Sequence, residues 1–207
     1  MTASVTPRTR TRLPAADRRH QILSATATLI AQRGYFGLSV QDVAHACGLT
    51  VPGVLHHFPS KDELLLAVLA HRDSEDAAAL AAQFGETQEP VALDGVQAHR
   101  VCAAIMERNA RQPELIRLFV VLGAEALTPD HPAHDFFRAR RKRTLALFAA
   151  AFAALAADPR ALARHVVALM DGLQLQWLEA DGEIDLAAEW RRVSRTLFAA
   201  DVDGASG

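Results

Sequence analysis

The sequence has few of the residues that typify disulfide-stabilised, β-rich or membrane-spanning proteins. Its 207 residues include two cysteines, one tyrosine and an aromatic content of 6%. Cys47 and Cys102 give neither a disulfide framework nor a metal-binding spacing, which favours a reducing cytoplasm. No apolar run approaches the roughly 20 residues that cross a bilayer, and the N-terminus lacks the apolar segment of a signal peptide. These absences predict a cytoplasmic protein without membrane contact.

The net charge is also small, but the charges are unevenly placed. The net charge is only −2, whereas residues 1–60 hold six arginines against two aspartates, a net of +4 that leaves −6 for the rest. A protein that is basic throughout is excluded. A basic head on an acidic body is typical of a phosphate-binding module attached to a different kind of domain. Residues 1–13 alone would equally fit a mobile basic tail.

What the sequence does contain is helical periodicity interrupted by helix-ending residues, which predicts an all-α fold of about nine helices. The first helix is expected at residues 17–33, ended by Gly34. Two short helices follow at residues 40–47 and 51–57, with Gly48 between them. The starts of six further helices are marked by Ser60, Pro90, Pro113, Pro132, Pro159 and Asp185.

The two short helices predict a helix-turn-helix motif at residues 39–58. Ser39 and Thr50 are the residue types that cap helix N-termini, and Asp42 completes a capping box with Ser39. In such a motif the second helix presents its leading end to the DNA major groove while the first supports it. The residues expected to pack inward are Leu49, Val54, Leu55, His57 and Phe58.

The outward surface of the second helix supplies the candidate DNA contacts. Thr50 and His56 can hydrogen-bond to phosphates or base edges. Val51 and Pro52 can touch thymine methyl groups, and Gly53 lets the helix backbone approach DNA closely. With so few polar side chains, DNA shape is expected to share the specificity.

Within positions 20–69, a set of residues stands at the spacing that is typical of one protein family. They are Arg33-Gly34-Tyr35, Ser39, Val43-Ala44, Gly48, Gly53, Leu55, His57-Phe58 and Ser60-Lys61. In this register the segment resembles the DNA-binding domain of the tetracycline-repressor (TetR) family. The resemblance implies a flexible basic arm (1–14), a helix-turn-helix domain (15–62), a helical ligand-binding and dimerisation domain (63–200) and a disordered tail (201–207).

The resemblance also implies roles for single residues. Ser39 and Lys61 would contact DNA phosphates, and Arg18 and Arg19 are expected to neutralise others. His56 stands where the family usually has a tyrosine, and an imidazole is shorter and carries a pH-dependent charge. The partner is therefore double-stranded DNA carrying a palindromic operator, and no cofactor is expected.

By the same resemblance, the middle helices would enclose a small-molecule pocket. The residues expected to line it are Phe119, Leu122, Glu125, Phe137, Phe148, Met170, Asp171, Gln174 and Trp177. Unpaired polar groups are costly among apolar neighbours. Glu125, Asp171 and Gln174 would therefore orient a ligand, pair with Arg or His from neighbouring helices, or lie across a dimer interface.

The last two helices are expected to pair with those of a second subunit. The helix after Pro159 is apolar nearly all round, which indicates two packing partners, its own domain and a twin subunit. The expected interface residues are Leu162, Val166, Leu169, Leu173, Trp190, Val193 and Leu197. A fully internal helix is the alternative.

The predicted function is a homodimeric repressor that a ligand releases from DNA, and three alternatives stand beside it. His131 and His134 could ligate a metal together with His99 or His165, although a site needs three or four converging ligands. An enzyme is disfavoured because no nucleophile–base set or phosphate loop can be assembled. The third alternative is an interaction module, and the basic run at 138–143 is expected to be a solvated helix face.

Overall fold

The computed structural model describes residues 13–84, 92–180 and 182–199, and within them every regular element is an α-helix. The helices of this described part are α1 (Ala15–Arg33), α2 (Val40–Cys47), α3 (Val51–Leu55), α4 (Lys61–Phe84), α5 (Gly95–Ala110), α6 (Pro113–Glu125), α7 (His134–Ala151), α8 (Pro159–Glu179) and α9 (Leu186–Ala199). The predicted all-α fold is confirmed. Three predicted features lie outside the described residues: most of the arm (1–14), the tail (201–207) and the helix start at Pro90. No helix in the described ranges has the length and apolarity to cross a membrane.

The helix boundaries of the N-terminal part follow from its local sequence. The Ser39 hydroxyl accepts from the Asp42 N–H (3.1 Å) while the Asp42 carboxylate accepts from the Ser39 N–H (3.0 Å), so the predicted capping box is present. Gly34 ends α1 with φ of 70°, and Gly48 ends α2 in the left-handed conformation (φ 63°, ψ 35°) that glycine adopts without strain.

Two predicted helix ends differ from the structure. α3 ends at Leu55 rather than His57, because the N–H groups of His57 and Phe58 both turn back to the carbonyl of Val54. The helix after Pro132 was expected to continue through Phe152 and Leu155, but α7 ends at Ala151. Tight turns of this kind satisfy the terminal carbonyls of a helix and depend on tertiary contacts that periodicity does not report.

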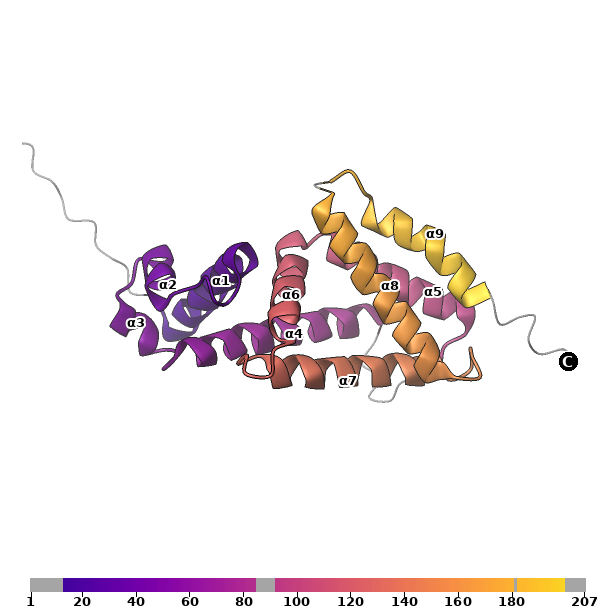
Figure 1. Cartoon of the computed structure of the whole chain (residues 1–207), viewed down its shortest axis with the longest axis horizontal. Helices are drawn as coiled ribbons and strands as arrows, with labels where there is room; N and C mark the ends of the chain where they lie inside the picture. The colour runs from indigo at the N-terminus through magenta and orange to yellow at the C-terminus, as the bar shows by residue number, and fades with distance from the viewer. Residues whose placement is uncertain (1–12, 85–91, 181, 200–207) are drawn as a thin grey trace, which may run out of the picture.

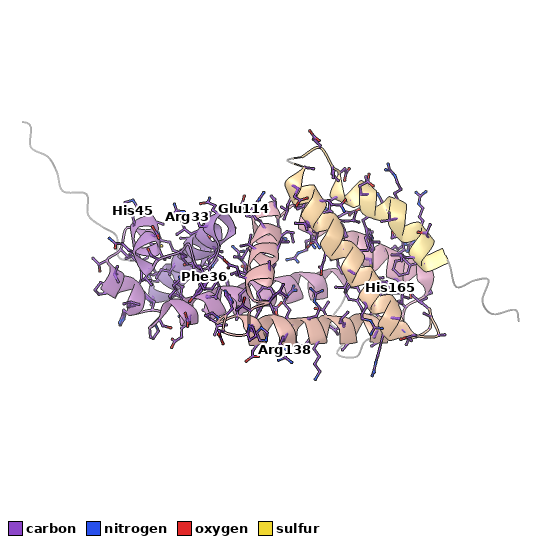
Figure 2. The ribbon with its side chains drawn as sticks, in the orientation of Figure 1. Arg33, Phe36, His45, Glu114, Arg138 and His165 are labelled. Carbon is purple, nitrogen blue, oxygen red and sulfur yellow. The ribbon has the colours of Figure 1, made fainter. Side chains whose placement is uncertain are left out.

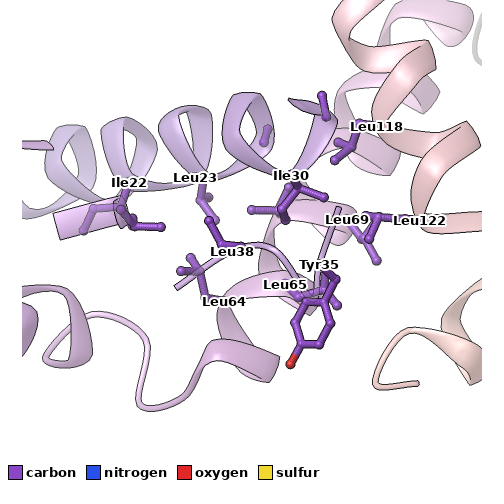
Figure 3. Packing of buried hydrophobic residues seen from close by; sticks show 14 of the residues in the cluster. Ile22, Leu23, Ile30, Tyr35, Leu38, Leu64, Leu65, Leu69, Leu118 and Leu122 are labelled. Carbon is purple, nitrogen blue, oxygen red and sulfur yellow. The ribbon is translucent and has the colours of Figure 1, made fainter. Parts of the chain in front are cut away.

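The first of two apolar cores joins the N-terminal helices to α6. Ile30 of α1 and Leu69 of α4 are fully buried against Leu118 and Leu122 of α6 (Figure 3). The boundary predicted after residue 62 therefore cuts through a shared core, since the first half of α4 and one face of α6 both belong to it.

The second core lies among α5, α8 and α9 (Figure 1). Cys102, Val166 and Trp190 are completely buried there. Burial raises the pKa of the Cys102 thiol to about 12, so the side chain packs as a small apolar group. Figure 1 shows α6 standing between the N-terminal helices and α8, at the junction of the two cores.

α7 is tied to α4 and α8 by its basic face. Asp73 of α4 accepts from Nε of Arg140 (2.9 Å) and from Nη2 of Arg143 (2.9 Å). Arg141 donates to Asp171 of α8 (2.7 Å). These exposed or half-exposed pairs fit the prediction of a solvated helix face at residues 138–143, and each is worth little in stability.

Candidate nucleic-acid interface

α3 is held against the domain by two buried side chains and presents its leading end to solvent. Val54 is fully buried and Phe58 is 2% exposed, whereas Thr50, Pro52 and His56 are exposed. The Thr50 hydroxyl accepts from the Gly53 N–H (3.2 Å), which satisfies one of the free donors at the helix start.

The structure corrects the placement of two side chains in the motif. Val51 was predicted to face outward, but it is half-buried and packs against the first core. Leu55 was predicted to pack inward, but it is 36% exposed. In so short a helix a small rotation exchanges these positions, so spacing alone does not decide between them.

Gly53 is half-exposed in α3, and a side chain here would contact its own motif. A Cβ atom at this position would lie 3.3 Å from the Thr50 hydroxyl oxygen, a tight but adjustable contact. The absence of a side chain here therefore leaves the α3 backbone open to close approach by another molecule.

The candidate phosphate contacts of α1 differ in how they are held. Arg18 donates to the side chain of Gln21 (2.6 Å), one turn along the same helix. Arg19 donates to the carbonyl of His57 (3.0 Å), and its guanidinium lies 4.1 Å from the centre of the Phe58 ring. Arg19 thus braces the C-terminal side of α3, a role that sequence reasoning did not assign to it.

Ser39 and Lys61 are also engaged within the domain. The Ser39 hydroxyl is part of the capping box, and its hydrogen bonds hold the pKa of the Asp42 carboxyl below its ordinary value, with a further contribution from Arg33. The Lys61 ammonium lies 4.1 Å above the ring of Tyr35. Both side chains are at the surface or half-exposed, so they can reach a phosphate while keeping their present support.

The neighbouring histidines behave differently from each other. His56 is exposed, and His57 is half-buried beside it, with ring centres 5.4 Å apart. Desolvation lowers the pKa of His57, and the nearby charges of His56, Arg18 and Arg19 lower it further. His57 is therefore neutral at pH 7, which agrees with a packing role.

A shallow hollow beside α2 is lined in part by Gln41, His45 and Ala46, to which no role was assigned from the sequence. Arg33 and His45, both exposed, lie on its rim, and Figure 2 shows them on the N-terminal helices. The complete lining is Leu29, Arg33, Ser39, Gln41, Asp42, His45 and Ala46. The signal available in the sequence was the polar face of α2, which the motif argument passed over.

The residues predicted to line one ligand pocket fall in different places. Phe119, Leu122 and Phe137 belong to or pack against the first core, whereas Phe148, Met170 and Trp177 belong to or pack against the second. The polar members have protein partners: Glu125 accepts from the Tyr35 N–H, Asp171 pairs with Arg141, and Gln174 bonds to Asn109. The structure therefore does not bring these nine residues together around one space.

The predicted dimer residues face mainly inward. Val166 and Trp190 are fully buried in their own subunit and are excluded as direct contacts. Leu162, Leu169, Leu173 and Leu197 pack against the second core while half-buried, and Val193 is half-buried. A stripe of apolar residues with helical periodicity indicates that one face of the helix is buried. It does not indicate whether the same subunit or a second subunit covers that face.

The two candidate metal ligands are engaged in local hydrogen bonds. Nδ1 of His131 accepts from the Ala133 N–H (3.1 Å), and a ring nitrogen of His134 lies 2.8 Å from the carbonyl oxygen of Ala126. Within the described part of the chain, no three His, Cys, Asp or Glu side chains converge as metal ligands would.

Three features together define a helix-turn-helix domain: α2 packed inward through Val43, Ala44 and Cys47, the Gly48 turn, and the exposed start of α3. Residues 22–68 match the family described as "Bacterial regulatory proteins, tetR family". The regulator BetI of Brucella anthropi is 34% identical over 73 residues, which are 35% of this chain and 38% of that protein. Alignments to other curated relatives cover as little as 26% of their length.

The fold extends the likeness beyond this domain. A structure of a TetR-family regulator from Rhodococcus sp. is 26% identical, covers 90% of this chain and 98% of its own, and superposes with a TM-score of 0.66. FadR of Bacillus subtilis, solved with stearoyl-CoA, gives 0.71 at 16% identity over 87% of this chain and 97% of its own, a likeness of fold. Residues 22–68 thus match the tetR family of bacterial regulatory proteins, and the remaining helices share the fold of these neighbours.

Proposed function

We propose that this protein is a cytoplasmic transcriptional regulator that binds a palindromic DNA site as a homodimer and is released by a small molecule. The observation that carries the proposal is the geometry of α3. Val54 and Phe58 anchor the helix, which leaves Thr50, Pro52 and His56 exposed at the surface. Such an end can enter the major groove, while nearby cationic groups bind the phosphates that set register.

A dimer is proposed because one five-residue helix reads too few base pairs for useful specificity. The outward side of α8 offers a surface for the second subunit. Ala168 and Leu175 are exposed there, and a Cβ added to the intervening Gly172 would meet no atom within 4 Å. Small residues spaced along one helix face allow a partner helix to approach closely.

The proposed effector acts by preferring one separation of the two DNA-binding domains. It would enter among α6, α7 and α8, where the half-buried Phe148 and Trp177 supply apolar surface. A ligand shifts such an equilibrium only by its differential affinity for the two states, and about 1–3 kcal/mol gives partial release. In this scheme the regulator represses until the ligand arrives, and no enzymatic step is proposed.

The experiment that tests the function starts from a pool of random DNA duplexes. Rounds of binding to the full-length protein are expected to enrich an inverted repeat whose half-sites lie about one helical turn, roughly 34 Å, apart. Lys61→Ala is expected to make the plot of log affinity against log salt shallower by about 0.9 for each phosphate that the protein no longer neutralises.

Lys142→Ala, on the exposed face of α7, is the matched control and should leave that slope unchanged. A shallower slope for Lys142→Ala with an unchanged slope for Lys61→Ala would place the phosphate contacts on α7 instead of at the start of α4. A pool that acquires no repeated sequence would overturn the proposed function.

A further inference from the structure

Glu125, the last residue of α6, reaches the turn that ends α1. Its Oε2 accepts a hydrogen bond from the backbone N–H of Tyr35 (2.9 Å). The carboxylate lies so close to Gly34 that a Cβ there would sit 2.4 Å from Oε1. Gly34 also has φ of 70°, so both backbone conformation and the approach of Glu125 require glycine. A side chain of the regulatory part thus caps a backbone group of the DNA-binding part.

His131, in the connection between α6 and α7, closes the same site from the other side. It is 3% exposed, and its ring packs edge-to-face on Tyr35 with ring centres 5.0 Å apart. Because Nδ1 accepts from the Ala133 N–H, the proton of the neutral ring is on Nε2, which lies 3.9 Å from Oε2 of Glu125. We call Gly34, Tyr35, Glu125 and His131 the α1–α6 joint.

The joint continues from Tyr35 to the start of α4. The Tyr35 hydroxyl donates to the carboxylate of Asp62, and the ammonium of Lys61 lies over the Tyr35 ring. Burial, reinforced by Asp62, raises the pKa of the Tyr35 hydroxyl, so it stays protonated and can donate. Tyr35 therefore lies between Glu125 and Lys61, the proposed phosphate contact.

The contacts around the joint are of two kinds. Leu118 and Leu122 bury apolar surface against α1 and α4 (Figure 3), an attraction that is strong but has no preferred direction. The Glu125–Tyr35 bond is directional and charge-assisted, and it holds only when α6 and α1 keep one relative position. Without it the apolar faces could rotate or slide at small cost.

We infer that Glu125 is a positioning residue, which fixes the orientation of α1–α3 on α6 and thereby the separation of the two α3 helices in a DNA-bound dimer. The inference rests on the proposed function for its DNA part. Of the roles predicted for Glu125, it favours pairing within the protein over orienting a ligand, since the carboxylate contacts the α1 turn and lies near His131.

The first test follows the Tyr35 amide by hydrogen exchange in the full-length protein without DNA. Glu125→Ala is expected to speed exchange of this amide at least tenfold, because its acceptor is removed. Glu125→Gln keeps an acceptor oxygen and should stay within about threefold of the wild type. Glu114→Ala is the matched control, an exposed carboxylate that Figure 2 shows at the other end of α6. Unchanged exchange in Glu125→Ala would overturn the inference.

The second test measures positioning with operators whose half-sites are moved one base pair closer or farther apart. The wild type should prefer one spacing by about tenfold, Glu125→Ala by less than threefold, and Glu125→Gln should restore the preference. A purely structural role would lower affinity for all spacings alike, which would overturn the inference. If Glu125→Ala does not fold, Glu125→Asp, whose shorter side chain keeps the charge, takes its place with the same expectation.

The failure of this inference differs from the failure of the proposed function. Wild-type protein that binds no selected duplex overturns both. The wild-type protein could instead bind with a clear spacing preference that Glu125→Ala and Glu125→Asp both keep in full. That result would overturn the positioning role alone.

Discussion

At the scale of single residues, polar side chains buried among apolar neighbours were predicted as sites but their partners were not. Glu125 and Gln174 were predicted to orient a ligand, to pair within the protein or to lie across a dimer interface. The structure pairs Glu125 with the Tyr35 N–H and Gln174 with Asn109, 90 and 65 positions away in the sequence. Sequence spacing identifies a costly buried group, whereas the group that satisfies it depends on how distant helices meet.

His131 is expected to make stability depend on pH. Its burial lowers its pKa, against the opposing effect of Glu125 and Asp62, while Lys61 lowers it further. The unfolded chain therefore binds a proton at a higher pH than the folded one, and stability rises with pH across that interval. The free energy of unfolding should fall as the pH is lowered from 7.5 to 5.5, and this fall should be smaller in His131→Asn.

Denaturant titrations at both pH values measure this change. His165→Asn, at an exposed position on α8 (Figure 2), is the control and should keep the wild-type pH dependence. The same fall in His131→Asn as in the wild type would show that His131 is not responsible. The pKa of His57 is also lowered, so His57 contributes to the pH dependence in the same direction. It accounts for part of the pH dependence that remains in His131→Asn.

At the scale of helices, the sequence predicted well which helices exist and in what order they follow. It predicted poorly which of their side chains face inward. Capping residues and glycines placed α1, α2 and the start of α3, because these signals act within a few residues. The inward or outward direction of Val51 and Leu55 was exchanged, and Val166 proved to be wholly internal. A periodic apolar stripe indicates that one face of a helix is covered. It does not indicate whether the same chain or a partner covers that face.

The outward side of α8 yields the prediction for the dimer. Leu175 is 44% exposed in line with Ala168 and Gly172. Leu175→Arg would place a charge in the proposed subunit contact, where desolvation is costly. Sedimentation should show a monomer, with operator affinity reduced at least tenfold. Leu127→Arg, at an 80% exposed leucine outside α8, should leave the protein dimeric; a dimeric Leu175→Arg would exclude this face.

At the scale of the whole molecule, α6 shares its core with the N-terminal helices, and this arrangement was not visible in the sequence. The predicted boundary after residue 62 followed the family motif, which ends near there. The first core nevertheless includes Leu118 and Leu122, more than 50 residues later. A regulatory part that shares its core with the DNA-binding part can transmit a change in α6 directly to α1, without a flexible linker between them.

The measurement that tests the central claim most directly is operator affinity of Gly53→Asp, by fluorescence anisotropy on the selected duplex. An acidic residue in the first turn is favourable to a helix. The Cβ would lie 3.3 Å from the adjustable Thr50 hydroxyl and 3.8 Å from the Leu49 Cβ, an ordinary contact, so the fold is expected to persist. The added negative charge would lie where α3 meets DNA phosphates. Unchanged melting temperature with affinity lowered at least tenfold is the predicted result, and affinity equal to that of the wild type would contradict DNA binding by the leading end of α3.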